Sequence, residues 1–366
     1  MANIGLPKLD IIFKALGVSA ISRGKRGVAI LIIKDDTNKT VNFATYNSYA
    51  DLTSIELAKY TAENQQYIKD VLDGVPLKLI VARMDIAGVL ADLLPMIRGI
   101  APRNCWICIA AGLIVDHDAL STWIKSENAN NKKCYKGMVF NATSPDNMAI
   151  VNFANTSVTF ADARGTMTGE HAIASLLGFF AGLPLSMSGI GKTLSYKFSS
   201  VVEPSSTETA VNAGKLILYS EDGKVKVARS INSLQTIGTN VTDDMKSIII
   251  VESMHLIYTD IYDAWNDSFK GKYKNFMANQ LLLVGAINSY FEGLANDFIL
   301  DPEYNNQTSI DLEVQRLANI PKFGQTEVSK WDNKKVMTMT VGTNVFLTAQ
   351  IKILNAFEDL ALNIYM

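Results

Sequence analysis

Cysteine, histidine and long apolar runs are all scarce in this chain. Its 366 residues include three cysteines and three histidines. An odd, small number of cysteines without a secretory signal predicts a protein that folds in a reducing cytoplasm. No uncharged apolar run reaches the roughly 20 residues that cross a bilayer, so we expect no membrane insertion. The net charge is only −2, which gives no reason to expect a nucleic-acid partner.

Catalytic frames are missing as well. His117, His171 and His255 are scattered through the sequence, with no HExxH spacing for a metal. No GxSxG motif marks a nucleophilic serine. A serine, histidine and aspartate triad stays open at this point, because triads are assembled in space rather than in sequence. Nothing in the motifs favours an enzyme, so we expect no catalytic residue.

Two short motifs resemble binding sites without meeting their requirements. Cys105 and Cys108 have CxxC spacing, but they lie in an apolar strand pattern, whereas a redox pair needs a helix N-terminus. A zinc site would need further ligands, and only Cys134 and His117 are near. The segment 188–193 (SGIGKT) ends like a phosphate-binding loop but has Ser186 where the first glycine belongs. We therefore expect buried structural cysteines and no metal or cofactor.

The part of the chain up to about residue 240 alternates between strand and helix patterns. Residues 27–46 predict a hairpin or two adjacent strands, and a capping box at Thr53–Glu56 predicts one helix that ends at Gly74. Apolar runs then alternate with helical stretches, which predicts a parallel sheet covered on both faces. We also expect a short strand pair over residues 149–163 and a buried helix over residues 169–185.

The sequence changes character towards its C-terminal third. Residues 213–230 predict a hairpin around Asp222-Gly223, because an Asp-Gly turn between alternating strands is a strong local signal. Residues 243–300 form long helical patterns. We expect a domain boundary near residues 237–244, followed by an α+β domain.

Both ends of the chain show strand alternation with an apolar face. Near the C-terminus we expect two strands, whose apolar faces hold Val345, Leu347, Ala349, Ile351 and Ile353, and then Leu360, Leu362, Ile364 and Met366. At the other end the face holds Leu9, Ile11, Phe13 and Ala15, and a basic tether over residues 17–27 could extend roughly 30 Å. Such strands either close a sheet of their own molecule or join another molecule's sheet. Both interpretations stay open.

One cluster of charge stands out. Lys270, Lys272 and Lys274 alternate in the segment SFKGKYKNF, between two helical patterns. They form either a solvated loop or a basic contact with an acidic partner surface, which salt would weaken.

Four segments together resemble the sheath subunit of contractile phage tails and phage-tail-like bacteriocins. They are the opening with GLP, LDIIFKAL and RGKRGVAIL; the stretch NAGKLILYSEDGKVKVARSINSLQT; IVESMHLIYTDI followed by FKGKYKN; and the ending TVGTNVFLTAQIKILNAFEDLALNIYM. Their order and spacing cover nearly the whole chain. The family often has aspartate where this chain has His255, which leaves any role at that position open.

The resemblance implies a fold class: α/β, with a subtilisin-like but non-catalytic α/β domain plus an α+β C-terminal domain with exchanged terminal β-strand arms. It implies five segments: residues 1–26 as an N-terminal arm and tether, 27–95 as an N-terminal α/β part, 96–240 as the subtilisin-like domain, 241–354 as a C-terminal domain facing the tail tube, and 355–366 as a C-terminal arm. Lys270, Lys272 and Lys274 are then candidate tube contacts.

The implied function is mechanical. Subunits form a homo-oligomer of stacked hexameric rings around a tail tube, and contraction drives the tube through a target cell envelope. The expected partners are the tube protein, the baseplate and the tail terminator, and the protein is expected to be made in a bacterial cytoplasm as part of a virion tail or tail-like particle. The rivals are an α/β hydrolytic enzyme with an intramolecular terminal sheet, and a tube or baseplate subunit, against which the α/β pattern argues.

Overall fold

The computed structural model describes residue 21 and residues 27–365. Its strands are β1 (Val28–Lys34), β2 (Phe43–Tyr46), β3 (Lys78–Met84), β4 (Cys105–Ile109), β5 (Lys136–Phe140), β6 (Ile150–Phe153), β7 (Ser157–Phe160), β8 (Thr166–Thr168), β9 (Phe198–Val201), β10 (Lys215–Leu216), β11 (Leu218–Glu221), β12 (Lys224–Val227), β13 (Gln307–Ile310) and β14 (Leu347–Gln350).

The α-helices are α2 (Ser54–Leu57), α3 (Ala62–Asp73), α4 (Leu90–Ile100), α5 (Ile114–Asn131), α6 (Ile173–Gly182), α7 (Thr207–Asn212), α8 (Ile248–Ala264), α9 (Met277–Asn296), α10 (Leu312–Phe323), α11 (Gln325–Val328) and α12 (Asn333–Thr338). Short 3₁₀ turns lie at η1 (Tyr49–Asp51), η2 (Gly169–Ala172) and η3 (Asp243–Lys246), and a π turn, η4 (Trp265–Phe269), follows α8.

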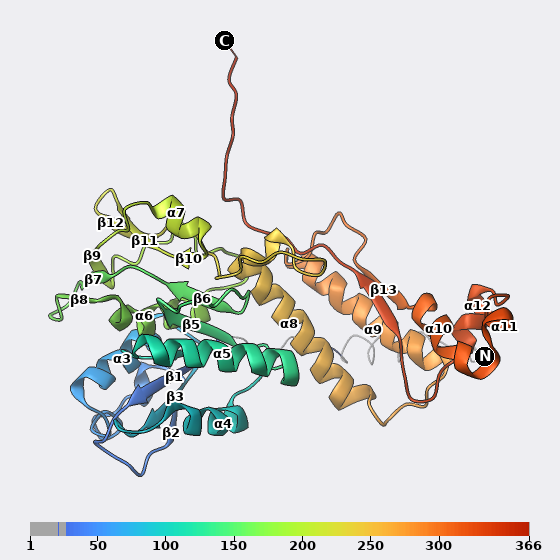
Figure 1. The fold of residues 1–366 in the computed structure, drawn as a ribbon, viewed down its shortest axis with the longest axis horizontal. Helices are drawn as coiled ribbons and strands as arrows, with labels where there is room; N and C mark the ends of the chain where they lie inside the picture. The colour runs from blue at the N-terminus through green and yellow to red at the C-terminus, as the bar shows by residue number, and fades with distance from the viewer. Residues whose placement is uncertain (1–20, 22–26, 366) are drawn as a thin grey trace, which may run out of the picture. The chain divides into compact units, whose positions relative to one another are not determined.

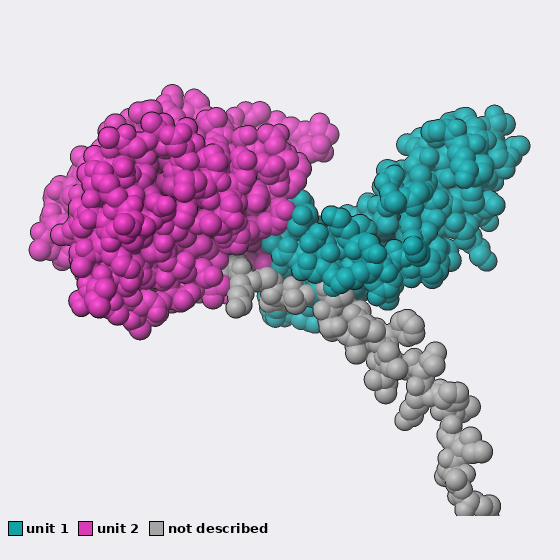
Figure 2. Space-filling view, turned by 90° about the horizontal axis from the view of Figure 1, so that it is seen from below, with its two compact units in different colours: residues 1–24, 257–354 teal, residues 25–256, 355–366 magenta. Residues whose placement is uncertain are grey.

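The described chain separates into two compact units (Figure 2). Among residues 27–365, residues 27–256 and 355–365 form the α/β unit, and residues 257–354 form the helical unit. The helical unit therefore lies between two segments of the α/β unit in the sequence. The five-segment division implied by the resemblance stays a prediction.

A seven-stranded sheet forms the centre of the α/β unit, in the order β10-β6-β5-β4-β1-β3-β2 (Figure 1). All its neighbours pair in parallel except β2, which runs antiparallel to β3. Apolar side chains bury both faces: one core includes side chains of α3 and α6, the other side chains of α4 and α5. The predicted parallel sheet with helices on both faces is confirmed.

Close helix packing fixes one of these layers. A Cβ atom added to Gly178 of α6 would lie 2.2 Å from the carbonyl oxygen of Val71 in α3. Only glycine lets the two backbones come this near. The buried helix predicted over residues 169–185 is confirmed as α6, with most of its side chains inside the core.

Both strands predicted within residues 27–46 are present as β1 and β2, but their predicted pairing, as a hairpin or as adjacent strands, is wrong. The central sheet places β3 between β1 and β2, so those two strands are not neighbours. The ladder of β1 with β3 continues past the strand end, where the Asp35 N–H donates to the Met84 carbonyl at 2.9 Å. The Asp35 carboxylate accepts hydrogen bonds from the backbone of Thr37 and Thr61, so the chain turns towards α3 instead of back along β1.

Two further local predictions need correction. The helix expected over residues 53–74 is two helices, because Thr61 caps a second start at α3 after α2 has ended at Leu57. Its predicted stop at Gly74 is confirmed as the C-cap. The strand pair expected over residues 149–163 is split: β6 belongs to the central sheet, whereas β7 lies between β8 and β9 in a separate sheet.

The other local signals hold. Strands β11 and β12 pair antiparallel around Asp222-Gly223, both of which have positive φ angles of 50° and 70°. These are the angles that a tight two-residue hairpin turn needs. The long helices predicted within residues 243–300 are α8 and α9.

Candidate interaction surfaces

The C-terminal arm, defined here as residues 360–365, is extended and unpaired within the described chain (Figure 1). Three of its apolar side chains, Leu360, Leu362 and Ile364, are 88%, 70% and 76% exposed. Phe357 just before the arm is fully exposed as well. Apolar side chains at alternate positions of an extended segment, left in water, are what a strand awaiting a partner presents. Met366, also predicted on this face, lies outside the described residues, as do Leu9, Ile11, Phe13 and Ala15 of the N-terminal arm.

The segment predicted as an acceptor strand is a strand over only part of its length, and its acceptor role stays a prediction. The strand expected over residues 345–354 is regular only at β14, which pairs antiparallel with β13. Ile353 makes one isolated bridge to Leu300. Ala349 on the predicted apolar face is exposed, and the other members, Val345, Leu347, Ile351 and Ile353, are only half-buried. The apolar face of this segment is therefore incompletely covered.

An asparagine closes one edge of this two-stranded sheet. The Asn288 side chain in α9 accepts a hydrogen bond from the Thr308 N–H at 2.7 Å and donates one to the Thr308 carbonyl at 3.3 Å. It thus replaces a neighbouring strand at β13. In an antiparallel ladder, opposite residues either bond to each other or both point outwards. Ala349 lies opposite Thr308, so its backbone groups face the other edge.

The sheet of β13 and β14 therefore has one closed edge and one edge that is free among the described strands. An exposed edge is a template for a further strand. The edge of β14 and the arm have matching requirements: one lacks a strand, and the other lacks a sheet.

The three lysines of the predicted tube contact lie in an exposed loop of the helical unit. Among described residues, none of Lys270, Lys272 and Lys274 forms an ion pair with a carboxylate, although the Lys272 ammonium donates to the Asp267 carbonyl. Asn275 ties the loop to residues 342–344 by donating to the carbonyls of Gly342 and Asn344 at 3.0 and 2.9 Å. The structure thus holds the loop in place while the lysines face outwards.

A hollow of about 560 Å³ lies beside these lysines. Trp265, Phe269, Tyr273 and Leu283 supply apolar walls, and Val345 at the start of the predicted acceptor segment also lines it. The loop therefore combines positive charge with an apolar recess on one unit, a combination that suits an acidic surface with apolar side chains.

Enzymes with an open α/β sheet bind ligands at the carboxyl ends of the parallel strands, where the strand order reverses. The order reverses at β1, between β3 and β4. At this place Lys34 forms an ion pair of 2.9 Å with Asp116, and the buried Asp35 carboxylate is hydrogen bonded to the α3 N-terminus. Burial favours a higher pKa for Asp35, but the hydrogen bonds from Asn64, Thr61 and Thr37 outweigh burial and lower the pKa below its usual value. The charged groups at this end of the sheet are thus paired with one another or with the α3 N-terminus.

The histidines do not converge on a shared site. His117 and His255 are buried, and burial lowers their pKa to about 4 and about 3, with Lys136 adding to the shift of His255. His171 instead contacts the Tyr67 hydroxyl, which also donates to Glu63 at 2.7 Å. The three side chains belong to separate structural environments within the α/β unit.

Acid sensitivity follows from the two buried histidines. An unfolded histidine titrates near pH 6.5, so below that pH the unfolded state binds more protons than the folded one. Stability is therefore lost as pH falls from about 6.5 towards 4, by about 1.4 kcal/mol per pH unit for each histidine. We expect the variant His117→Leu/His255→Leu to lose less stability than the wild type in urea unfolding series from pH 7.5 to 4.5. Parallel pH profiles would contradict the assignment.

The cysteines and the SGIGKT segment have structural surroundings. Cys105, Cys108 and Cys134 are buried. The side chains of Cys105 and Cys108 belong to the cores on opposite faces of the sheet, and burial raises the pKa of Cys105 to about 12. Residues 188–193 form a loop between α6 and β9. The described residues contain no cluster of histidine, cysteine and carboxylate side chains able to hold a metal ion.

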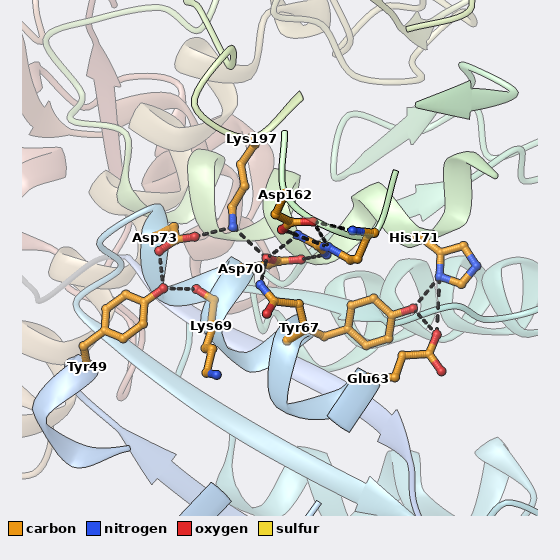
Figure 3. A network of polar contacts seen from close by, with 11 residues as sticks. Tyr49, Glu63, Tyr67, Lys69, Asp70, Asp73, Asp162, His171 and Lys197 are labelled. Atoms are coloured by element: carbon orange, nitrogen blue, oxygen red, sulfur yellow. Dashed lines mark hydrogen bonds and ion pairs between the residues drawn. The ribbon is translucent and has the colours of Figure 1, made fainter. Parts of the chain in front are cut away.

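A buried polar network braces the α/β unit (Figure 3). Asp70 of α3 accepts from the Lys197 ammonium at 2.6 Å and from two nitrogens of Arg164 at 2.6 and 3.1 Å. Asp73 pairs with Lys197, and Asp162 pairs with Arg164. Burial lowers the pKa of Lys197, but Asp70 and Asp73 outweigh it and raise the pKa above its usual value. The network joins three segments through ion pairs between three carboxylates and two cations.

Sequence reasoning missed several of these groups. Arg229, whose guanidinium pairs with Glu358 at 3.0 Å, is 129 residues away from it, and Asn288 contacts a strand rather than its own helix. Neither residue stands in a periodic pattern. One signal was available: the acidic pair Glu358-Asp359 directly precedes the apolar arm, and such a pair calls for a basic partner at the root of that arm.

Comparison with known proteins gives consistent matches. The phage tail sheath C-terminal domain family matches residues 240–366. The tail sheath protein of Clostridium phage phiCD119 is 27% identical over 373 residues, which cover 99% of each chain. No helix within the described residues is both long and apolar enough to cross a membrane.

Solved structures share the fold. The helical sheath of the anti-feeding prophage in its contracted state has a TM-score of 0.69 at 11% identity, covering 100% of this chain and 99% of that one. The sheath tail protein from Listeria innocua has a TM-score of 0.65 at 13% identity, covering 84% of this chain and 94% of that one. The resemblance carried by the four sequence segments is confirmed: this chain is similar to a contractile-phage tail sheath protein along nearly its whole length, and residues 240–366 match the phage tail sheath C-terminal domain family.

Proposed function

We propose that this protein is the polymerising subunit of a contractile sheath. Copies assemble as stacked hexameric rings around a tail tube, and contraction drives the tube through a target cell envelope. The observation that supports the proposal is that one chain has both an exposed apolar arm at residues 360–365, which lacks a sheet to join, and a two-stranded sheet whose β14 edge is free among the described strands. When the arm pairs with that edge in another copy, the backbone groups of both strands become hydrogen bonded and the apolar side chains of the arm can be buried.

The size of this joint suits a lattice. Burying Leu360, Leu362 and Ile364 contributes roughly 1.5 to 3 kcal/mol each, and each backbone hydrogen bond adds about 0.5 to 1.5 kcal/mol net. Ordering six or seven residues costs about 1 to 2 kcal/mol per residue. The terms nearly cancel for one arm, so single joints are reversible and the lattice is held by many joints together.

The N-terminal arm is part of the same proposal. Leu9, Ile11, Phe13 and Ala15 supply a second exchanged strand, and the tether at residues 17–27 lets neighbouring bodies move while their arms stay bound. The body of the subunit is a subtilisin-like domain without catalysis, divided into the five segments expected from the resemblance. Energy for contraction is stored in the extended lattice, because body contacts differ between the two lattices.

The remaining partners follow from this role. The tube, the baseplate and the tail terminator contact the sheath, and the protein is made in a bacterial cytoplasm. The rival hydrolytic enzyme with an intramolecular terminal sheet is not favoured, since the arm is not folded into a sheet of its own chain.

Electron microscopy of the purified protein, alone and with its tube, tests the proposal. We expect helical tubes with sixfold rings when the tube is present. A protein that stays monomeric with the tube at high concentration, and that turns over chromogenic peptides or esters, would favour the enzyme instead.

The lysine loop gives a second test. Changing Lys270, Lys272 and Lys274 to Glu is expected to reduce tube-templated assembly at least tenfold, because the exposed charges would then repel an acidic tube surface. The fold should not change, since these side chains lie in solvent. Sedimentation of sheath with tube at several salt concentrations measures the effect.

A matched control keeps the same charge change elsewhere. Lys224, Lys330 and Lys334 are also exposed, and their replacement by Glu should leave assembly near the wild-type level. Equal assembly of both triple variants would mean that the 270–274 lysines are merely solvated.

A further inference from the structure

The C-terminal arm has a fixed root, formed by residues 355–359. Asn355 accepts a hydrogen bond from the Ser247 hydroxyl at 3.1 Å. Glu358 accepts from the Ser188 hydroxyl at 3.2 Å and from the Arg229 Nε at 3.0 Å. Arg229 also pairs with Asp359 through its second nitrogen. All of these partners belong to the α/β unit.

Contacts end abruptly after this root. The Glu358 side chain is only 13% exposed, whereas Asp359 is 82% exposed and Leu360 is 88% exposed. Among the described residues, the ion pairs of Arg229 with Glu358 and Asp359 are therefore the last charged contacts of the chain with the α/β unit before the exposed arm begins. Arg229 follows the antiparallel hairpin of β11 and β12, and the neighbouring Ala228 N–H donates to the Ile217 carbonyl at 2.9 Å. The backbone that carries Arg229 is therefore held by the hydrogen bonds of this hairpin and its neighbour.

We propose that Arg229 is a positioning residue for assembly: by holding Glu358 and Asp359 it fixes where and in which direction the arm leaves its own body. This inference rests on the proposed function. A tethered strand reaches an acceptor edge faster when its root is fixed, because fewer conformations must be lost on binding. Without the grip, the apolar arm samples its own surface as well as that of a neighbour.

The chemistry of the site suits arginine. A guanidinium presents its donors as a planar fork and holds two carboxylates at once, whereas lysine offers one point charge. The Arg229 side chain is 37% exposed, so salt screens the interaction. The grip is therefore firm at low salt and weakens as salt rises, a response that apolar packing of the root would not give.

Hydrogen exchange of the unassembled subunit tests the grip without any assembly. In Arg229→Lys we expect amide exchange at residues 355–359 to rise about fivefold at low salt, the factor that about 1 kcal/mol represents. High salt should raise exchange of the wild type to the same level and leave the variant unchanged. Arg98→Lys, which alters a comparable Arg98–Glu127 pair with Arg98 46% exposed, should leave exchange at 355–359 as in the wild type.

Assembly kinetics then test the role. We expect Arg229→Lys to form tubes several-fold more slowly than the wild type and Arg98→Lys, with an unchanged melting temperature. The double variant Arg229→Glu/Glu358→Arg should recover part of the assembly rate that Arg229→Glu alone loses. Unchanged exchange in Arg229→Lys overturns the grip, and raised exchange with a wild-type assembly rate overturns its positioning role. If the wild type itself forms no tubes, the proposed function fails, while the exchange result still decides whether the grip exists.

Discussion

Deletion of Leu360–Met366 is expected to leave a folded protein that no longer polymerises. Leu360, Leu362 and Ile364 of this arm are mostly exposed, so their removal takes nothing from either core. The melting temperature should stay within about 2 °C of the wild type, because surface changes usually alter stability by less than 0.5 kcal/mol. Tube formation, followed by light scattering and electron microscopy, should fall below detection. Normal tubes from the truncated protein would reject arm exchange.

A finer version separates strand pairing from mere length. Changing Leu360, Leu362 and Ile364 to Ser removes one apolar face while keeping the backbone. Changing Ala361 and Tyr365 to Ser alters only the other face. Side chains alternate between the two faces of a strand, so only the first variant should block assembly. Equal effects of both sets would argue against a strand.

Asp70→Ala is expected to destabilise the α/β unit by about 3 to 5 kcal/mol, the range for removing one partner of a buried ion pair. Asp70 is fully buried and accepts from both Lys197 and Arg164 (Figure 3). Its loss leaves the buried Lys197 with Asp73 alone. Thermal and urea unfolding of the variant and the wild type measure the change.

Asp162→Ala is the matched control for this network. Asp162 also pairs with Arg164, but its side chain is 45% exposed, so its removal should cost no more than about 1 kcal/mol. Asp70→Asn retains the shape and loses the charge, and should fall near Asp70→Ala if the charge matters. A cost below 1 kcal/mol for Asp70→Ala would show that the network adds little to stability.

Local and periodic features of this fold are predictable from sequence. The Asp222-Gly223 turn is recognisable because few residue pairs accept two positive φ angles. The apolar strands β3, β4 and β5 are recognisable because a parallel sheet buries both faces of its strands. Strand order is not local. The insertion of β3 between β1 and β2 depends on partners that are 50 positions apart for β1 and β3 and 33 to 39 positions apart for β2 and β3. No pattern within residues 27–46 reports it.

The candidate surfaces divide in the same way. Alternation marks the arm and the β14 segment, and three lysines at every second position mark the loop at 270–274. The polar residues that hold these surfaces in place occur singly, so they give no repeating pattern in the sequence. Asn288 closes the β13 edge with one amide group, and Arg229 grips residues that are 129 and 130 positions away. Only the folded chain brings these side chains to their partners.

The connectivity of the two units has a mechanical consequence. Within residues 27–365, the chain passes from the α/β unit into the helical unit after residue 256 and returns at residue 355, so two covalent connections join the units. A force applied at the lysine loop is divided between the two connections. Two connections also resist rotation of one unit against the other more than a single connection would. Pulling and torque on the loop are thereby carried by covalent bonds into the same body that anchors the outgoing strand.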